Sequence, residues 1–464
     1  MGMDRTKFAG WLPRQLSPSG PRYLALVSAL EQDITEGRLT DGFRLPSHRK
    51  LAQQLGLSVG TVSKAYQEAE QRGIVSGHVG QGTFVRRPAP GRDEASAARE
   101  PVNLALNVPA DGRETEILSE LLAEVSQGRE LAPLLNYHPH GGIRQHREII
   151  AASVSGGSFI VDPARLFLCN GAQHAIDIAL RLVARPGDAV LVDSLTYSGF
   201  KAIGAANHLT LVPVAMDGEG AHPDALAAAC RASGAKVFYC MPTLQSPTAR
   251  TMSLARRRRI AELAEELDLK VIEDDVYGFF LPERPVLLTE LIPDRSFYIT
   301  SYSKCVAPGF RLGTLTVPSA FTEQTELLLH ASAWFVAPML SETAVRLIES
   351  GKLDELVRER RQQALDRYRV FSGIFPAAER LEFPPFYGWL PLPPEWSAVG
   401  FAAAARGRSI FVTPPIASMA DGADPGAVRV CLGGPKDLTE LSNALYVLHD
   451  IVSRSPSLNV FSVA

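Results

Sequence analysis

A lysine and an arginine lie among small polar side chains near the middle of the chain. Lys304 follows two hydroxyl side chains, Ser301 and Ser303, and Arg311 comes seven positions later. Hydroxyls and a guanidinium suit a phosphate dianion, and a lysine amine can condense with an aldehyde. A cofactor that carries both groups is pyridoxal phosphate, held as a Schiff base to lysine. Taken alone, the same residues also fit a serine-rich loop with ordinary surface cations.

The elements that must position these residues alternate between strands and helices from about residue 103 onward. Short apolar runs predict buried strands at 167–169, 189–192, 236–239, 270–272 and 296–299. Helical segments such as 172–184 and 254–267 lie between them. This alternation is typical of a mostly parallel sheet, in which ligand-binding loops gather at the strand ends.

Side chains with fitting chemistry follow those strand ends. Ala172 and Gln173 open a helix after a strand, where backbone N–H groups would face a phosphate. Tyr197, after the next strand, offers an aromatic face for a flat ring. After a later strand, Asp274 can keep a pyridine nitrogen protonated, and Tyr277 can donate to the ring's phenolic oxygen.

This half of the chain resembles the fold-type I aminotransferases of the aspartate aminotransferase superfamily, over about 350 residues. The resemblance implies an α/β body with a mostly parallel seven-stranded sheet, helices on both faces, and a small α+β domain. It implies pyridoxal phosphate as cofactor, with Lys304 as the catalytic residue that forms the Schiff base and Asp274 at the pyridine nitrogen. It places Tyr277 at the phenolic oxygen and Tyr197 on the ring. The residues that it implies for the phosphate are Ala172, Gln173, Ser301, Ser303 and Arg311.

Three further positions matter for that resemblance. Tyr137 would reach the cofactor phosphate of the neighbouring subunit, and Arg429 would bind the carboxylate of a substrate or effector. The loop before the Asp274 strand reads Ser-Pro-Thr-Ala from Ser246, where the family usually has Asn-Pro-Thr-Gly. The asparagine normally bonds the phenolic oxygen, and Ser246 is shorter. One lost hydrogen bond costs about 1 kcal/mol, which weakens the case for turnover more than that for cofactor binding.

The first ninety residues indicate a different domain. Apolar residues recur at helical spacing over 23–34, and Ser47 and Ser58 are N-cap candidates for two further helices separated by Gly56. Helix, glycine turn and helix form the helix-turn-helix pattern, and residues 74–85 predict a glycine-tipped hairpin. Small or cationic side chains begin the outer face of the second of these helices, which suits a major groove.

This head resembles the GntR-type winged helix over about seventy residues. The matching motifs are Gly-x-Arg-Leu-Pro-Ser-x-Arg-x-Leu-Ala, Leu-Ser-x-Gly-Thr-Val-x-x-Ala-Tyr and Gly-x-Gly-Thr-Phe-Val. The resemblance implies that Arg49 grips a DNA phosphate, with Thr61 at the start of the recognition helix. The residues expected at DNA are Arg44, Ser47, Arg49, Ser58, Gly60, Thr61, Ser63 and Lys64, with Gly80 and Gln81 at the wing tip. Many members carry cations at the positions of Val59 and Ser63, so the operator sequence is not implied. The alternative is a small helical domain that binds protein.

Charge and composition fit this division. Residues 1–90 hold 12 Lys and Arg against 7 Asp and Glu, a net charge of +5, so the remainder carries −8 of the total −3. A basic head on an acidic body indicates that the head meets an anion. Residues 88–102 lack periodicity and indicate a linker. The predicted domains are therefore 1–87 and 103–464, the latter with a large cofactor-binding subdomain at about 150–350 and a small one from 103–149 and 351–464.

Other features receive ordinary interpretations. Five widely spaced cysteines and the absence of a secretory or membrane-spanning pattern predict a cytoplasmic protein without disulfides. His138, His140 and His146 lack partners at metal spacing, so no metal is expected. Arg256–Arg259 is expected to be a solvated helix face, and not a nucleic-acid patch. The aromatic stretch Phe386–Trp389 fits core packing, or else an effector pocket.

A GntR-like winged helix linked to an aminotransferase-like body is the arrangement of the MocR/GabR regulators, which the chain resembles over nearly its whole length. The resemblance implies a transcriptional regulator that binds double-stranded promoter DNA and senses an amino compound. It also implies a homodimer, arranged head-to-tail. An active aminotransferase, acting on an amino acid and a 2-oxo acid, with an accessory head is the alternative. A sensor of pyridoxal phosphate itself is a third interpretation.

Overall fold

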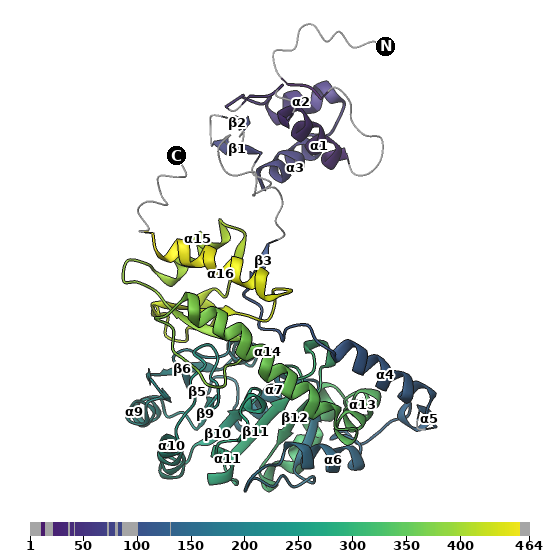
Figure 1. The fold of residues 1–464 in the computed structure, drawn as a ribbon, viewed down its shortest axis with the longest axis vertical. Helices are drawn as coiled ribbons and strands as arrows, with labels where there is room; N and C mark the ends of the chain where they lie inside the picture. The colour runs from purple at the N-terminus through teal and green to yellow at the C-terminus, as the bar shows by residue number, and fades with distance from the viewer. Residues whose placement is uncertain are drawn as a thin grey trace. The chain divides into compact units, whose positions relative to one another are not determined.

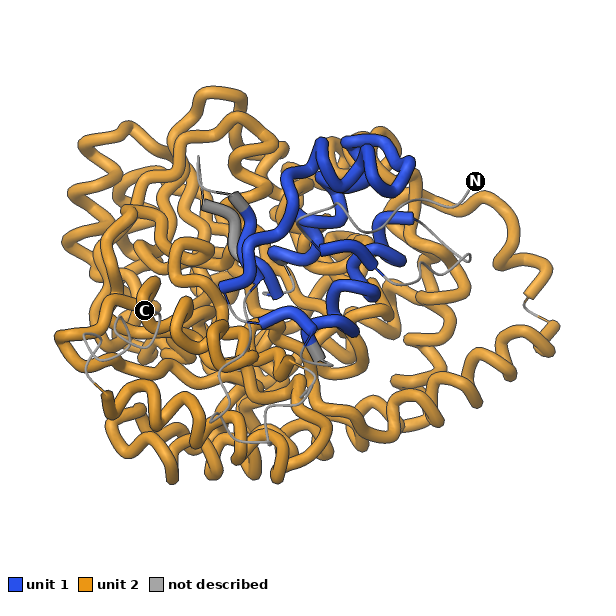
Figure 2. The backbone as a smooth tube through the Cα atoms, turned by 90° about the horizontal axis from the view of Figure 1, so that it is seen from above, with its two compact units in different colours: residues 1–99 blue, residues 100–464 orange. Residues whose placement is uncertain are grey.

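The computed structural model divides the chain into two compact units, residues 1–99 and residues 100–464 (Figure 2). It describes residues 11–13, 22–35, 38–40, 42–71, 74–78, 82–85, 101–129 and 131–454. Among these residues, no helix has the length and apolar character needed to cross a membrane.

The first unit is a winged helix. Its helices are α1 (Arg22–Thr35), α2 (His48–Leu55) and α3 (Val59–Gln71), and its antiparallel hairpin pairs β1 (Val75–His78) with β2 (Gly82–Val85). After α2 the chain turns at Gly56, whose φ of 63° lies in the left-handed region that glycine adopts without strain. Leu26, Leu51, Val62 and Val85 meet in one core. The predicted helix-turn-helix with a wing is confirmed.

The two predicted helix caps differ. Ser58 is a side-chain cap, because its Oγ accepts a hydrogen bond of 3.1 Å from the backbone N–H of Thr61. Ser47 does occupy the N-cap position of α2, but its hydroxyl makes no cap bond in the described part of the unit. The first turn of α2 is joined to Ser47 through its backbone carbonyl, which accepts from the N–H of Leu51 at 2.9 Å. The exposed Ser47 hydroxyl is therefore left for other contacts.

The second unit is built on a seven-stranded sheet with the order β4-β12-β11-β10-β9-β5-β6 (Figure 1). The strands are β4 (Leu166–Cys169), β5 (Ala189–Asp193), β6 (Thr210–Val214), β9 (Val237–Cys240), β10 (Lys270–Asp274), β11 (Ser296–Ser301) and β12 (Gly313–Thr316). Strand β12 runs antiparallel to both neighbours, and the other pairs are parallel. The prediction of a mostly parallel sheet is confirmed.

Helices cover both faces of this sheet because successive side chains of a strand point to opposite sides. Tyr239 lies in the core under α7, whereas its neighbour Phe238 lies in the core under α9 and α10. The helices around the sheet are α7 (Ala172–Val183), α8 (Ser198–Ala206), α9 (Pro223–Ser233), α10 (Leu254–Glu266), α11 (Leu288–Leu291) and α12 (Thr322–Ser332). A short hairpin, β7 (Met216–Asp217) with β8 (Gly220–Ala221), lies between α8 and α9 in the chain.

Two further groups of elements complete this unit. Helices α4 (Glu114–Gln127), α5 (Leu131–Leu134), α6 (Arg144–Val154) and α13 (Pro338–Glu349) precede and follow the sheet segment in the chain. The small α+β layer consists of β3 (Val102–Leu104), β13 (Tyr387–Pro391), β14 (Ile410–Val412), β15 (Ala427–Cys431), α15 (Ala398–Arg406) and α16 (Leu438–Val452). The long helix α14 (Lys352–Ile374) joins the layers, with Ala364 in the sheet core and Phe371 in the core of the small layer (Figure 1).

Candidate functional site

Lys304 lies in the turn that follows β11. Its Nζ donates to the backbone carbonyl of Asn107 at 2.6 Å, and the side chain is half-buried. Burial lowers the pKa of Lys304 to about 8, and the charge of Arg429 adds to this effect. At pH 7 about a tenth of such an amine is uncharged, against fewer than about one in a thousand for an ordinary lysine. The uncharged amine is the form that condenses with an aldehyde.

Asn107 is a site residue that the sequence did not reveal. Its carbonyl accepts from Lys304, and its Nδ2 donates to the hydroxyl of Tyr277 at 2.7 Å. It lies 197 positions before Lys304, on the segment that leaves β3, so no local pattern points to it. Asn107 thus fixes the lysine amine and the tyrosine hydroxyl relative to each other.

Three consecutive acidic residues, Glu273, Asp274 and Asp275, are buried where β10 ends. Glu273 pairs with Arg257 at 3.5 Å, and both side chains are 0% exposed. Arg257 also donates to the Pro242 carbonyl at 2.8 Å and the Thr243 hydroxyl at 2.9 Å. The expectation that the arginines opening α10 form a solvated face is therefore wrong for Arg257. It turns inward because Glu273 and these two acceptors satisfy its guanidinium.

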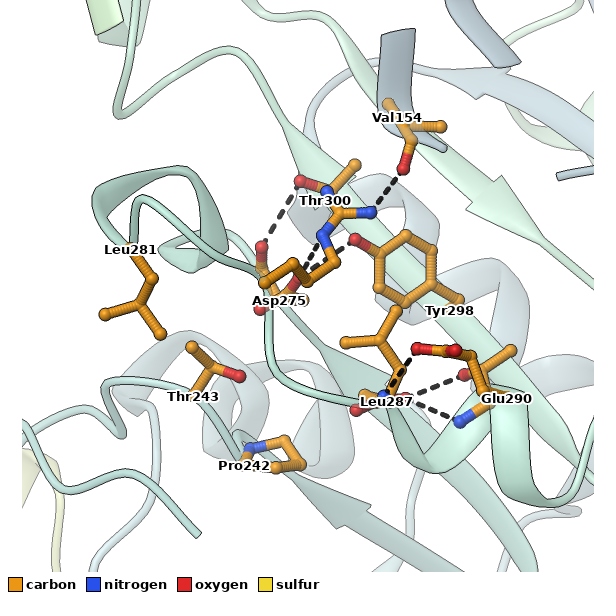
Figure 3. Close-up of polar contacts among 12 residues, drawn as sticks. Val154, Pro242, Thr243, Asp275, Leu281, Leu287, Glu290, Tyr298 and Thr300 are labelled. Atoms are coloured by element: carbon orange, nitrogen blue, oxygen red, sulfur yellow. Dashed lines mark hydrogen bonds and ion pairs between the residues drawn. The ribbon is translucent and has the colours of Figure 1, made fainter. Parts of the chain in front are cut away.

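Asp275 is also neutralised by a cation. Its Oδ2 accepts from the Tyr298 hydroxyl at 2.9 Å (Figure 3). The same oxygen lies 4.0 Å from Nε of Arg284. Arg284 in turn donates to the Val154 carbonyl. The Thr300 hydroxyl donates to the backbone carbonyl of Asp275 at 3.3 Å (Figure 3). Asp275 thus ties β10 to β11 and to the end of α6, and this role is structural.

Asp274 differs from both neighbours, since it has no ion pair within the described ranges. Its Oδ2 accepts from the Tyr239 hydroxyl at 2.7 Å, while its Oδ1 is buried and makes no hydrogen bond to the described residues. Burial raises the pKa of Asp274 to about 6. A buried carboxylate oxygen without a partner suggests a missing donor. The N–H of a pyridinium ring is such a donor, so Asp274 fits the predicted cofactor.

Replacing Asp274 by asparagine should stabilise the cofactor-free protein at pH 8 by about 3 kcal/mol. Burial raises the folded-state pKa from the ordinary value of 3.8 to about 6, so the folded protein holds this proton more tightly than the unfolded chain. The resulting stabilisation is complete below the unfolded pKa and is lost as the pH rises through about 6. Asparagine avoids this loss and can still accept from Tyr239. Urea unfolding at pH 4 and pH 8 tests the prediction, and a pH-independent difference between the two proteins would contradict it.

The phosphate end of the site depends on two glycines. Helix α7 begins after Gly171, whose φ is 80°. A Cβ on Gly171 would lie 2.7 Å from Nη2 of Arg311, and one on Gly313 would lie 2.7 Å from the backbone N of Ala172. The absence of these Cβ atoms lets Arg311 and β12 approach the N-terminus of α7. Unpaired N–H groups at a helix N-terminus attract anions, so this end of the site fits a phosphate.

Strand pairing brings the predicted phosphate residues together. Gly313 on β12 pairs with Ser301 on one side and with Cys169, three residues before Ala172, on the other. Two residues after Ser301, the Ser303 hydroxyl is buried and has no hydrogen-bond partner in the described part of the chain. An unsatisfied buried hydroxyl is unusual, and a phosphate oxygen would satisfy it. Gln173 is the second residue of α7 and lies beside the same helix end.

Tyr197 lies at the start of α8. Its ring covers Gly199, where a Cβ would be 2.4 Å from the ring carbons. Burial raises the pKa of Tyr197, and the charges of Asp274, Arg311 and Arg429 also act on it. Tyr197 therefore belongs to the same group of side chains as the candidate ring and phosphate residues.

Arg429, on β15, faces hydroxyl groups. Its Nη1 donates to Ser246 Oγ at 2.9 Å, and its Nε and Nη2 donate to Thr413 Oγ1 at 3.2 and 3.1 Å. Ser246, considered above for the phenolic oxygen, thus contacts the predicted carboxylate-binding arginine. Thr413 is a further residue that the sequence did not reveal.

Tyr387 supports the Ser246 loop from below. Its hydroxyl donates to the carbonyls of Leu244 and Gln245, at 2.6 and 3.1 Å. The guanidinium of Arg429 lies 5.8 Å from the centre of its ring. Tyr387 is fully buried, so this residue of the aromatic stretch packs in the core. Its ring also lies against the Arg429 guanidinium.

Tyr137 is not brought to Lys304 within one chain. It is 81% exposed and packs beside Trp334, with ring centres 5.5 Å apart. Leu135 and Trp334 are exposed as well. The expected contact of Tyr137 with the phosphate of a neighbouring subunit stays a prediction, and its side chain is accessible for that contact.

The predicted DNA-contacting residues of the first unit mostly lie on its surface. The exposed ones are Arg44, Ser47, Arg49, Ser58, Gly60 and Lys64, and the half-buried ones are Thr61 and Ser63. Two of these side chains have partners that the sequence did not reveal. Ser63 Oγ lies 3.0 Å from Nδ1 of His48, and Lys64 Nζ lies 4.2 Å above the Tyr23 ring. Gly80 and Gln81 lie outside the described residues.

Known proteins resemble both units. Residues 22–85 match the bacterial regulatory proteins of the gntR family, and residues 99–445 match aminotransferase class I and II. The HTH-type transcriptional regulator YdeF of Bacillus subtilis (strain 168), which is named as uncharacterized, is 29% identical over 95% of this chain and 96% of its own. Aromatic-amino-acid aminotransferase 1 of Thermococcus litoralis is 27% identical over 55% of this chain and 63% of its own.

A solved structure has the same fold as the second unit. The crystal structure of an archaeal alanine:glyoxylate aminotransferase superposes with a TM-score of 0.69 at 22% identity, covering 78% of this chain and 92% of that chain. The predicted fold class, the MocR/GabR-type domain arrangement and pyridoxal phosphate as the cofactor are thereby confirmed. The chain belongs to the aminotransferase class I and II family and carries a DNA-binding domain of the gntR family ahead of its aminotransferase domain.

Proposed function

We propose that this protein is a cytoplasmic transcriptional regulator that binds promoter DNA through its first unit and an amino compound through its second. The observation that carries the proposal is the Lys304 site in a chain whose head is a gntR-type winged helix. Burial lowers the pKa of the Lys304 amine to about 8, and the buried Oδ1 of Asp274 has no hydrogen-bond partner among the residues that the structure describes. Such a site is prepared to hold pyridoxal phosphate whether or not turnover follows.

Each site residue has a distinct task in this proposal. Bound pyridoxal phosphate supplies an aldehyde that amines capture and a ring that withdraws electrons. Lys304 would hold the cofactor through Nζ, and Asp274 would keep a proton on the ring nitrogen. Tyr277 and Ser246 would serve the phenolic oxygen, and Tyr197 would pack on the ring. The N-terminus of α7 at Ala172 and Gln173 would hold the phosphate, together with Ser301, Ser303 and Arg311.

Arg429 binds the carboxylate of the amino compound. A guanidinium matches a carboxylate through two parallel N–H donors. Arg429 lies on β15 in the small layer, whereas Lys304 follows β11 in the sheet. A ligand that contacts both residues therefore favours one arrangement of the two layers over others. It can change DNA binding only by this difference in affinity between arrangements.

A homodimer completes the proposal. Leu135, Tyr137 and Trp334 are exposed apolar or aromatic side chains, and such side chains favour burial. This supports a second copy of the chain as the partner that covers them. In that arrangement Tyr137 reaches the phosphate of the partner. A head-to-tail dimer presents two winged helices, which fit repeated half-sites in the operator.

Replacing Arg49 by alanine should weaken binding to a promoter fragment and also reduce its dependence on salt. Arg49 is exposed at the start of α2, where the resemblance places a phosphate contact. One lost phosphate contact should lower the slope of log K against log salt by about 0.9. Gel shifts across a series of salt concentrations measure both effects. Arg144→Ala, at an exposed position of the second unit, is the control, and unchanged affinity of Arg49→Ala would exclude this groove assignment.

An active aminotransferase is the second candidate, supported by the combination of Lys304, Asp274 and Tyr277 in one site. Keto-acid formation from a panel of amino acids separates the two functions. Rapid multiple turnover would favour the enzyme, and a spectral change without turnover would favour the regulator. A sensor of pyridoxal phosphate itself would respond in DNA affinity to the cofactor and not to amines.

A further inference from the structure

Four of the five N–H donors of Arg429 are already engaged within the protein. Nε and one Nη2 donor bond to Thr413 Oγ1, at 3.2 and 3.1 Å, and Nη2 also contacts the Ala105 carbonyl at 3.4 Å. Nη1 donates to Ser246 Oγ at 2.9 Å. Among the described residues, one Nη1 proton is left without an acceptor. A carboxylate needs two parallel donors for its strongest contact, so one of these bonds must open when a carboxylate binds.

The two hydroxyls hold Arg429 in different ways. Thr413 Oγ1 accepts from two guanidinium nitrogens and donates its own proton to the Ala105 carbonyl at 3.0 Å. Its hydroxyl therefore uses both its accepting and its donating capacity. Because it is bonded to a backbone carbonyl, it holds the Arg429 guanidinium in a fixed orientation. Ser246 Oγ makes one hydrogen bond to the described residues, the bond to Nη1. It is the contact that a ligand can replace at the lowest cost.

The Ser246 hydroxyl cannot easily withdraw from Arg429 without a competitor. Its residue is 1% exposed, and the two preceding carbonyls, of Leu244 and Gln245, are held by the Tyr387 hydroxyl. Both partners are ionised when a carboxylate accepts from Arg429, and its two oxygens can take two parallel N–H donors, so this contact is stronger than the single bond from Nη1 to the neutral Ser246 hydroxyl. A carboxylate can therefore replace the hydroxyl, whereas a neutral amide or ester offers no such advantage.

We propose that Ser246 is a specificity-determining residue that occupies Nη1 of Arg429 until a ligand's carboxylate displaces it. A ligand must break the bond between Ser246 and Arg429 before it can bind Nη1, and this costs free energy. Charged carboxylates recover that cost and neutral ligands do not, so carboxylates are selected. Thr413 has the opposite effect on carboxylate affinity. It is a positioning residue that keeps the guanidinium oriented for the ligand. This inference rests on the carboxylate-binding role proposed above for Arg429.

Removing the two hydroxyls one at a time tests the proposal. The full-length protein loaded with pyridoxal phosphate is titrated calorimetrically with succinate, a carboxylate without an amine, at constant ionic strength. Ser246→Ala should bind succinate about fivefold more tightly, since the competing bond is gone. Thr413→Val should bind it about fivefold more weakly, since the guanidinium loses its support. Ser126→Ala, at an exposed position of α4, should match the wild type.

The opposite signs distinguish this proposal from a structural role. If both hydroxyls merely maintained the site, both substitutions would weaken binding, and Ser246→Ala binding succinate no better than wild type overturns the proposal. Ser246→Cys, which keeps the volume and lacks a strong acceptor, replaces Ser246→Ala if that variant does not fold. Arg429→Gln distinguishes a failure of the carboxylate role of Arg429 from a failure of the Ser246 inference. If it binds succinate as well as wild type, the carboxylate role of Arg429 fails and this inference with it. If it loses binding while Ser246→Ala gains none, the inference alone fails.

Discussion

The Lys304→Ala protein is expected to be purified without the visible absorption band of bound pyridoxal phosphate. In the proposed site the Lys304 amine holds the cofactor covalently, and the remaining contacts to ring and phosphate are noncovalent. Cofactor added to the variant should therefore be removed by gel filtration, whereas the wild type should retain it. Reduction of the wild type with borohydride should add the cofactor's mass to the peptide that contains Lys304.

Lys201→Ala is the matched control for this experiment. Lys201 lies on α8, burial lowers its pKa as well, and its Nζ donates to the carbonyls of Ile416 and Met419 at 2.7 and 2.5 Å. It is thus a second partly buried lysine with a shifted pKa, but it serves a loop and not the site. Its loss should leave the band in place. A band that persists in Lys304→Ala and disappears in Lys201→Ala would reverse the assignment.

The Arg257→Ala protein should lose about 3–5 kcal/mol of unfolding free energy, the largest effect on stability that we expect. Both members of the pair with Glu273 are completely buried, so the substitution leaves a carboxylate in the core without a cation. The Pro242 carbonyl and the Thr243 hydroxyl lose their donor at the same time. Urea unfolding followed by tryptophan fluorescence reports mainly on this unit, which holds three of the four tryptophans, Trp334, Trp389 and Trp396.

The pH dependence of this loss identifies its cause. Burial raises the pKa of Glu273, while Arg257 lowers it, so removing the arginine should raise it further. Glu273 then becomes neutral more readily in acid, and the destabilisation should shrink as the pH falls toward 5. A loss caused by packing alone would not depend on pH. Arg259→Ala, at an exposed position of the same helix, should leave the unfolding midpoint unchanged.

The sequence predicted those features that depend on neighbouring residues. Periods of 2 and 3.6 located the strands and helices, and glycine positions located the turns, because backbone conformation and side-chain direction are largely local properties. The cofactor-binding role of the Lys304 stretch could be predicted for the same reason. Its two hydroxyls and its arginine lie within eleven positions of the chain, and their chemistry matches one cofactor.

Features that depend on distant residues required the tertiary structure. The Glu-Asp-Asp run at the end of β10 contains three acids. The sequence alone does not show which of them has no ion pair among the described residues. Arg257 faces inward because Glu273 lies across from α10, and the periodicity of α10 could not show this. The bond between Ser246 and Arg429 joins positions 183 residues apart.

By itself, the sequence determined a basic winged-helix head and an α/β body with a lysine suited to pyridoxal phosphate. The fold alone decided that Asn107 bridges Lys304 and Tyr277, and that hydroxyls occupy the Arg429 guanidinium. It also decided that one Asp274 oxygen has no hydrogen bond to the described residues. Strand order and layer packing bring these side chains together from opposite ends of the unit. Contacts of this kind leave no local periodicity in the sequence, because each partner is surrounded by residues that serve other purposes.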